Sequence, residues 1–324
     1  MDLPAQEIPS WFVLTAAFLF GAAWGSFFNV AIYRWPRGMS VVTPPSTCPA
    51  CGTLIPARHN VPILGYLFLG GKTACCKTRL SPRYALVELL TAMLAVAIAQ
   101  RFYVGAPESA TVFGAAIHAG LLFIFVGGLV IVTFVDLERM EIPDEVSLPC
   151  AALGLATAPL RDPAHIGDYA LGAGGGFLAI QLLFVWSYEH LTGRRGMGEG
   201  DSKLLMMIGA FLGWQGALFA VVAGSVQGIA VSIFALVTGT PLGPDLEALE
   251  AEERQLAGVG SEPAEQERRE DPQEHELYEE PEPSYFGHLK LPFGPLLALG
   301  AIEYLFFGQR IIELWFGWIG SWFG

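Results

Sequence analysis

Long apolar runs dominate this sequence and limit what it can fold into. Hydrophobic residues make up 53% of the chain and charged residues only 15%, a balance that is too apolar for an ordinary soluble domain. A helix needs about 20 apolar residues to cross the hydrocarbon layer of a membrane. Apolar runs lie at 11–33, 84–104, 111–135, 146–160, 169–188, 204–239 and 291–319. The sequence therefore predicts an all-α, polytopic membrane protein.

The run at 204–239 is too long for a single crossing. It contains Gly213, Trp214, Gln215 and Gly216, and paired glycines at this spacing are a turn signal. A turn at this point divides the run into a short helix and a longer one. We therefore expect about eight transmembrane helices.

Charged residues outside the apolar runs predict the orientation. The first ten residues contain Asp2 and Glu7 but no Lys or Arg, so the first run is expected to be a retained span and not a signal peptide. The segment 34–83 has seven Lys and Arg residues and no acid, which places it in the cytoplasm and the N-terminus in the periplasm. Counting crossings then puts 136–145 and 191–203 on the cytoplasmic side as well.

We expect five regions along the chain. They are the first transmembrane helix at 1–33, a cytoplasmic cysteine-containing loop at 34–83, a transmembrane core at 84–239, an acidic insertion at 240–290, and the last helix with the C-terminus at 291–324. The insertion has 15 Asp and Glu against 4 Lys and Arg and is rich in proline, so we expect a disordered linker, which the count of crossings places in the cytoplasm. A partner-docking role for it is the alternative.

Two short acidic stretches lie at the edges of apolar runs, VDLERMEIPD at 135–144 and GMGEGDSK at 196–203. Asp136 ends one run and Asp201 precedes another, so both carboxylates are expected at the cytoplasmic rim of the membrane. Ionisable groups near hydrocarbon are costly and usually mark a functional site, although both residues alone also fit acids of a solvated loop. Two carboxylates that meet can share one proton, and one then acts as base while the other acts as acid.

The surroundings of Asp201 favour the functional reading. Gly196, Gly198 and Gly200 alternate with other residues, a pattern that suits an extended backbone open to a substrate strand. Helix polarity gives a further hypothesis, because Asp136 is expected at a helix C-terminus and Asp201 just before a helix N-terminus. We predict that Asp136 holds the shared proton, with each helix end contributing on the order of 0.3–1 kcal/mol.

Several motifs together resemble those of the type IV prepilin peptidases, which are membrane aspartyl proteases of the Gly-x-Gly-Asp kind. The resemblance covers nearly the whole chain apart from 241–289. The matching segments, in order, are GSFFNVAIYR (25–34), CPACG (48–52), SPRYALVE (81–88), Asp136 with IPD (142–144), GMGEGDSK (196–203), GAFLGW (209–214) and LPFGP (291–295).

The resemblance implies a bifunctional enzyme of the bacterial inner membrane. Such an enzyme removes the short basic leader of prepilins and pseudopilins after a glycine at the cytoplasmic face, and then methylates the new N-terminal amine. Asp136 and Asp201 are implied as the catalytic pair and S-adenosylmethionine as the methyl donor. The implied partners are these substrates and membrane lipid, with no nucleic acid. No glycine-rich dinucleotide fingerprint identifies cofactor-binding residues.

Two other functions also use acidic residues in a membrane protein. A related Gly-x-Gly-Asp peptidase without methyltransferase activity would share the acids, but the cysteine loop favours the bifunctional form. A proton-coupled transporter or channel would place carboxylates near the membrane midplane within inverted repeats, and the sequence shows neither.

Four cysteines of the cytoplasmic loop suggest a metal site, because disulfides are rare in a reducing compartment. Cys48 and Cys51 form half of a zinc knuckle, whereas Thr73 stands where the second half would need a thiol, and Cys75 lies next to Cys76. A structural zinc ion needs four ligands. The candidates are these four cysteines, or three thiols with His59; weak binding and ordinary reduced cysteines are the alternatives.

Four further polar residues have mainly structural interpretations. Asp144 is expected to cap the next helix, with a direct catalytic role as the alternative. Glu88 is expected to pair with Arg83 or Arg79, although a substrate or cofactor contact is equally open. Lys203 either neutralises the aspartate pair or only reflects membrane topology. Asn29 is expected to form a hydrogen bond between helices.

Overall fold

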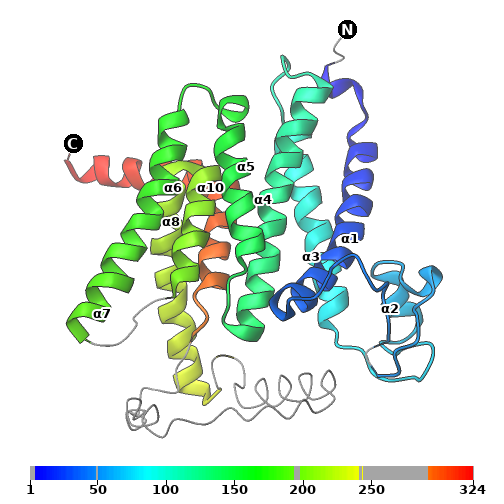
Figure 1. Ribbon diagram of the computed structural model, residues 1–324. Coiled ribbons are helices and arrows are strands. Elements are labelled where there is room, and N and C mark those ends of the chain that lie inside the picture. Colours follow the sequence, from blue (N-terminus) through cyan, green and yellow to red (C-terminus); the bar gives the residue numbers. More distant parts are fainter. Residues whose placement is uncertain (1–3, 49, 193–197, 241–242, 244–290, 324) are drawn as a thin grey trace, which may run out of the picture.

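The computed structural model describes residues 4–48, 50–192, 198–240, 243 and 291–323, and these residues form a helical bundle (Figure 1). The named elements of this part of the chain are all helices, and only isolated β-bridges occur beside them. The main helices are α1 (Ser10–Arg34), α2 (Leu64–Phe68), α3 (Arg83–Ile98), α4 (Val112–Arg139), α5 (Asp144–Arg161), α6 (Ile166–Ile180), α7 (Ser187–Thr192), α8 (Glu199–Thr238) and α10 (Gly294–Phe323). Two π-helical turns, Ala99–Val104 and Gln181–Trp186, continue α3 and α6. The all-α prediction is confirmed.

Five helices of the described residues are long and apolar enough to cross a membrane. These segments are Ser10–Arg37, Arg83–Val104, Val112–Arg139, Ile166–Leu183 and Glu199–Thr238. Each coincides with a run that the sequence identified. The protein is therefore a multi-pass membrane protein. A count of eight crossings stays a prediction, because α5 does not meet the same criterion and α10 contributes only the shorter apolar helix Gly294–Gly308.

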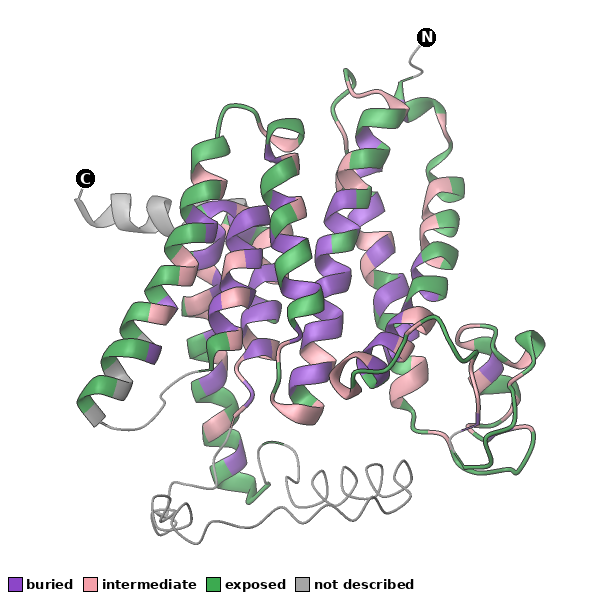
Figure 2. Ribbon diagram, in the orientation of Figure 1, coloured by how far each residue is buried: buried purple, intermediate pink, exposed green. Residues whose placement is uncertain are grey.

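Helix α4 lies in the middle of the bundle and supplies much of its core. It packs against α1, α3, α5 and α10, and residues such as Phe125, Leu129 and Val132 are fully buried. The outer faces of the surrounding helices expose large apolar side chains, including Leu19, Leu183 and Val237. Figure 2 shows this arrangement, with buried residues inside the bundle and exposed residues around it. An apolar exterior of this kind suits contact with lipid.

Helix α8 is broken at Gly213, as the turn signal in the sequence predicted. Gly213 has φ +73° and ψ −177°, a conformation that is open to glycine but strained for other residues. The break separates an arm at 199–212 from an arm at 214–238. The Arg161 guanidinium donates hydrogen bonds to the carbonyl oxygens of Ala210 and Phe211 (2.8 and 2.7 Å) and of Gly154 (2.6 Å). The bonds to Ala210 and Phe211 satisfy carbonyl groups that the break in α8 leaves without helical partners.

The two ends of the bundle differ in what they carry. Helix α2 and the cysteine-containing segment lie at the end where α4 finishes and α8 starts, and the N-terminal end of α1 lies at the opposite end (Figure 1). The acidic stretches and the cysteine loop therefore share one end, as expected. The acidic insertion at 240–290 lies almost entirely outside the described residues.

Candidate active site

Asp136 lies in the last turn of α4 and is 5% exposed. The helix ends at Met140, which adopts a left-handed conformation with φ +56° and donates its N–H to the Asp136 carbonyl oxygen at 2.9 Å. The Asp136 carboxyl group accepts a second hydrogen bond at Oδ2, from the backbone N–H of Gly294 at 3.0 Å. Because Gly294 is the first residue of α10, its amide has no partner within that helix and can hold the carboxyl group.

Asp201 lies in the first turn of α8 and is 8% exposed. The helix begins at Glu199, so Asp201 is inside the helix and does not precede it. Its backbone N–H donates to the Gly198 carbonyl oxygen at 3.2 Å. Asp201 is thus held at a helix N-terminus, where the partial positive charge of the free amide groups stabilises a carboxylate.

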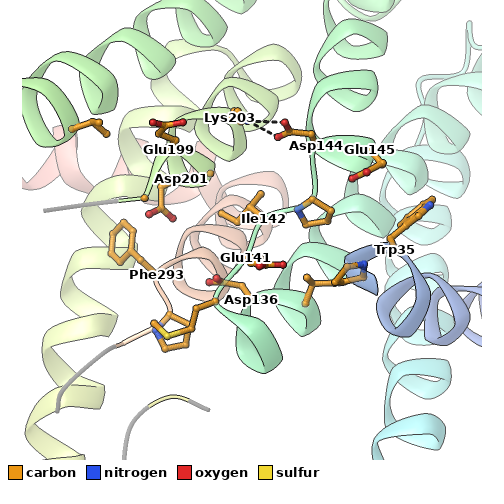
Figure 3. A pocket seen from close by; sticks show the side chains of 18 of the residues that line it. Trp35, Asp136, Glu141, Ile142, Asp144, Glu145, Glu199, Asp201, Lys203 and Phe293 are labelled. Carbon is orange, nitrogen blue, oxygen red and sulfur yellow. Dashed lines mark hydrogen bonds and ion pairs between the residues drawn. The ribbon is translucent and has the colours of Figure 1, made fainter. Parts of the chain in front are cut away.

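Asp136 and Asp201 line one cavity of about 860 Å³, and their carboxyl groups are near enough to interact electrostatically. Figure 3 shows both side chains pointing into the cavity, with Phe293 beside them. The wall comes from the ends of α1 and α4, the starts of α5 and α8, and the segment 291–293 before α10. The structure therefore brings together two acids from distant parts of the sequence, at one end of the bundle.

Gly200 and Ile142 form a close contact on the cavity wall. A Cβ atom on Gly200 would lie 2.8 Å from the Ile142 Cβ, which real structures do not tolerate. Gly200 is therefore needed for the close packing of α8 against Ile142 in the segment before α5. The expected extended backbone is found only at Gly198, with φ −73° and ψ 145°, while Gly196 lies outside the described residues.

The N-cap role expected for Asp144 is wrong. Pro143 is the cap residue of α5, and Asp144 is the first helical residue, without a side-chain bond to the helix end. Instead, Lys203 Nζ donates to both Asp144 oxygens at 2.6 and 2.7 Å. Lys203 is therefore paired with Asp144 at the cavity wall.

The partner expected for Glu88 is also wrong. Arg83 forms its ion pair with Glu138 in the last turn of α4. The buried Glu88 carboxylate accepts a hydrogen bond from the backbone N–H of Ile63 at 2.6 Å. Ile63 has φ +63°, a strained conformation for a β-branched residue, so Glu88 holds an unusual loop conformation in place.

The hydrogen bond expected for Asn29 is confirmed. Its side-chain amide on α1 donates to the Tyr84 carbonyl oxygen on α3 at 2.9 Å. This bond joins the two helices that flank the cysteine-containing segment.

The four loop cysteines form a compact cluster. The sulfur atoms of Cys48, Cys51, Cys75 and Cys76 all lie within 4.8 Å of one another. Three of these separations are 3.6 Å (Cys48 to Cys76), 3.4 Å (Cys51 to Cys75) and 3.9 Å (Cys75 to Cys76). Zinc–sulfur bonds of about 2.3 Å in a tetrahedron place sulfur atoms about 3.8 Å apart. The donor set therefore has the size and the chemistry of a Cys₄ zinc site, and His59 is not part of the group.

Thr73 explains how adjacent cysteines fit into this cluster. The segment 73–78 turns back on itself, with Thr73 N–H donating to the Thr78 carbonyl oxygen at 2.8 Å. The Thr73 hydroxyl lies 3.2 Å from the Cys76 sulfur, and hydrogen bonds from Thr73 and Thr78 lower the pKa of Cys76 to about 5. The thiol absent at position 73 is thus replaced by Cys75, while Thr73 contacts a cluster sulfur.

Helix polarity acts on Asp136 from two sides. The C-terminus of α4 disfavours the ionised carboxyl group, but the N-terminus of α10 donates to it and favours ionisation. Only the first effect can be foreseen from the sequence, because the contact with α10 depends on how the helices pack. The assignment of the shared proton to Asp136 therefore stays a prediction.

Family models match two parts of the chain. Residues 19–102 match a bacterial peptidase A24 N-terminal domain, and residues 123–233 match the type IV leader peptidase family. The second match contains both aspartates, and the first contains the four clustered cysteines. No solved structure matches this chain.

Proteins of several bacteria are similar to this chain over most of their length. A prepilin leader peptidase/N-methyltransferase of Aeromonas hydrophila is 36% identical over 253 residues, which cover 71% of this chain and 83% of that protein. Proteins of the same name from Pseudomonas aeruginosa and Klebsiella pneumoniae are 33% and 37% identical and are covered to 86% and 84%. The fold and the site define a multi-pass membrane protein with two buried carboxyl groups in one cavity. The chain belongs to the type IV leader peptidase family.

Proposed function

We propose that this protein cleaves the leader peptides of type IV prepilins and pseudopilins and N-methylates the new N-terminal residue, with Asp136 and Asp201 as the catalytic pair. The observation that carries the proposal is the convergence of these two buried carboxyl groups in one cavity. The relatives named as prepilin leader peptidase/N-methyltransferases support both activities.

The geometry suits acid–base hydrolysis of a peptide bond. One ionised carboxylate takes a proton from a water molecule, and the water oxygen bonds to the scissile carbonyl carbon. The protonated partner gives its proton to the carbonyl oxygen. When the tetrahedral intermediate collapses, the carbon–nitrogen bond breaks and the first carboxyl group gives the proton that it took from water to the leaving amine. A hydroxyl group of the intermediate returns a proton to the second carboxylate. Burial strengthens the electrostatic interactions between the acids and the reacting groups, because the cavity wall replaces much of the solvent around both acids.

Methyl transfer requires S-adenosylmethionine, which supplies the methyl group to the amine released by cleavage. The described part of the chain has no strand–turn–helix unit with a glycine-rich loop, the arrangement that binds dinucleotide-like cofactors in α/β enzymes. These residues therefore do not fit that mode of cofactor binding, and we assign none of them to the methyl donor.

The cysteine cluster supports a structural zinc site. Cys48, Cys51, Cys75 and Cys76 would hold the ion as thiolates, and zinc would then cross-link the segments around 48–53 and 73–78. We place this role apart from the cleavage chemistry, which needs only the two carboxyl groups and water.

Topology supports cleavage at the cytoplasmic face of the inner membrane. The end of the bundle that carries both aspartates also carries the cysteine-containing segment. The sequence of this region, 34–83, has seven Lys and Arg residues and no Asp or Glu. Positive loops of this kind stay in the cytoplasm. The N-terminus would then lie in the periplasm. The regions 1–33, 34–83, 84–239, 240–290 and 291–324 stay our proposed division of the chain.

The test replaces Asp136 and Asp201 singly by Ala and follows a prepilin substrate with membranes and detergent. We expect uncut precursor with both variants, and a shortened, N-methylated product with the unmodified enzyme by mass spectrometry. Thermal denaturation in detergent checks that each variant is folded. Full cleavage by either folded variant would remove that residue from the catalytic pair.

A further inference from the structure

The ion pair between Asp144 and Lys203 lies on the wall of the proposed active site. Lys203 Nζ contacts both carboxylate oxygens of Asp144, at 2.6 and 2.7 Å, and Figure 3 shows the pair beside Asp201. Asp144 is the first residue of α5, and Lys203 is in the second turn of α8. The pair therefore joins the starts of two helices that approach the same cavity.

Each member of this pair is close in sequence to one of the two proposed catalytic acids. Asp144 follows Asp136 by a turn of only a few residues, and Lys203 follows Asp201 by two residues. The pair thus forms a short bridge between the segment that carries one proposed catalytic acid and the segment that carries the other.

The contact between Gly200 and Ile142 provides a second attachment. Gly200 and Lys203 are three residues apart, so they lie on the same side of α8, and both face the segment 142–144. Both contacts hold one face of the first turns of α8 against the segment 142–144, in addition to the packing of buried residues such as Ser202 and Leu204. Asp201 lies about 100° around the helix from Gly200 and is directed toward the cavity.

Stability alone does not account for this arrangement. The two side chains are partly exposed, 51% for Asp144 and 27% for Lys203. Ion pairs with such exposure contribute little to stability, because water screens them. The rate of a reaction is far more sensitive to the placement of a reacting group, since a displacement of about 1 Å can slow a reaction on the order of 100-fold.

We propose that Asp144 and Lys203 are positioning residues that set Asp201 against Asp136. Asp144 fixes Lys203, Lys203 fixes the first turns of α8, and the orientation of Asp201 follows. This inference rests on the proposed function, because it assumes that Asp201 is catalytic. It also assigns Lys203 to Asp144, and not to the neutralisation of the catalytic acids.

Charge gives the proposal a second consequence. The other acids that line the cavity are Glu141, Glu145 and Glu199, besides the two catalytic residues. Neutralising Asp144 leaves the Lys203 ammonium uncompensated beside these acids, which favours ionised carboxylates and moves the acid limb of the pH–rate profile to lower pH. Neutralising Lys203 leaves an extra negative charge and moves the same limb to higher pH. A pair too far from the catalytic acids to influence them would give no such opposite shifts.

The experiment compares Asp144→Asn, Lys203→Met, Lys203→Arg and the exchanged variant Asp144→Lys/Lys203→Asp in cleavage of a prepilin substrate. For each single neutral variant we expect kcat to fall about tenfold to a hundredfold while KM stays within about twofold, because orientation is lost and substrate binding is not. Lys203→Arg and the exchanged variant restore an ion pair, and we expect kcat within about threefold of the unmodified enzyme.

The matched control is Asp162→Asn. Asp162 follows the last residue of α5, at the opposite end of that helix, and its carboxylate lies 2.9 Å from His165 Nδ1. We expect this variant to keep the unmodified kcat and pH profile. Thermal denaturation in detergent identifies any variant that fails to fold, and Lys203→Arg remains informative because it keeps the charge.

Two results would overturn the positioning role. They are a folded Asp144→Asn variant with unchanged kcat and pH profile, and an exchanged variant no faster than the single variants. Asp201→Asn is included in the same assay to separate the two proposals. If Asp201→Asn cleaves at the normal rate, the proposed catalytic pair has failed; if it is inactive while Asp144→Asn is fully active, only the positioning role has failed.

Discussion

The aspartate cavity and the cysteine cluster gather their reactive groups in different ways. In the cavity, Asp136 receives a hydrogen bond from Gly294, 158 positions further along the chain, and Asp201 comes from a third helix. In the cluster, the paired sulfurs of Cys48 and Cys76 are only 28 positions apart and lie on short turns of one loop. The cavity therefore depends on helix packing across the bundle, whereas the cluster depends on local turns.

This difference teaches which changes each region tolerates. A turn can supply its thiol from a neighbouring position, as Cys75 does where Thr73 has none, because the loop backbone adjusts. The residues around the aspartates can adjust less, because backbone contacts hold the acids in closely packed positions. Substitutions in the cavity are expected to affect cleavage strongly, and those in the cluster to affect metal binding.

Apart from changes to the two aspartates themselves, the largest effect is expected for Gly294→Ala. A Cβ atom at this position would lie 2.7 Å from Asp136 Oδ2, so the carboxyl group must move or the start of α10 must shift. We expect kcat to fall on the order of 100-fold, since a displacement of about 1 Å is costly for a reacting group. Cleavage kinetics with a prepilin substrate measure the effect.

Gly120→Ala is the control for this prediction. Gly120 lies on α4, the helix that carries Asp136, and a Cβ atom there meets no atom within 4 Å. We expect kcat within about twofold of the unmodified enzyme, because alanine is favoured over glycine in a helix. Equal rates for Gly294→Ala and Gly120→Ala would show that the Asp136–Gly294 contact does not position the acid.

A smaller effect on cleavage is expected for Cys75→Ser, together with a large effect on metal content. Loss of one of four thiolates is expected to reduce zinc from about one ion per chain to a small fraction, while cleavage stays within about threefold. The double variant Thr73→Cys/Cys75→Ser is expected to recover zinc, because residue 73 already contacts the Cys76 sulfur. Metal analysis of purified protein measures the content.

Two results would contradict the metal assignment. Full zinc content in Cys75→Ser would show that Cys75 is not a ligand, and no recovery in the double variant would show that position 73 does not face the ion. If the variant lost cleavage activity together with its zinc, the proposal that the metal site is independent of the cleavage chemistry would be wrong.

The smallest effect on cleavage is expected for Arg161→Met. Its guanidinium donates to two carbonyl oxygens at the end of the first arm of α8 and to one in α5, and charge-assisted hydrogen bonds are individually strong. We expect the free energy of unfolding to fall by about 2–3 kcal/mol. Asp201 lies about 15 Å along the same arm, so kcat should stay within about twofold. Thermal denaturation in detergent and cleavage kinetics separate the two quantities.

Arg101→Met is the control for this prediction, because Arg101 is exposed on the π-helical turn that continues α3. We expect no change in stability or rate. If Arg161→Met were as stable as Arg101→Met, the bonds to α8 would not stabilise the break.

Much of the helical fold could be predicted from the sequence, because apolar length is a direct consequence of the bilayer. The break at Gly213 was also predictable, since a glycine signal interrupted a run that was too long for one crossing. Asp136 and Asp201 were identified because both lay at the ends of apolar runs, and the structure places them in one cavity.

The contacts that fix these acids were not predictable. The Gly294 amide and the Ile63 amide are backbone donors, which no side-chain pattern reveals. Asp144 and Lys203 are 59 positions apart, and their pairing depends on how α5 and α8 pack. Arg83 was expected to pair with Glu88 by proximity in sequence, but Glu138 on another helix takes that place.

The most direct test of the catalytic pair measures prepilin cleavage rates for Asp136→Asn, Asp201→Asn and the double variant, relative to the unmodified enzyme. Groups that act as a unit give non-additive losses, because removing the second group costs little once the first is absent. We predict that each single variant is as slow as the double variant, with all three folded in detergent. A single variant that retains the normal rate, or losses that multiply in the double variant, would contradict joint catalysis by these two aspartates.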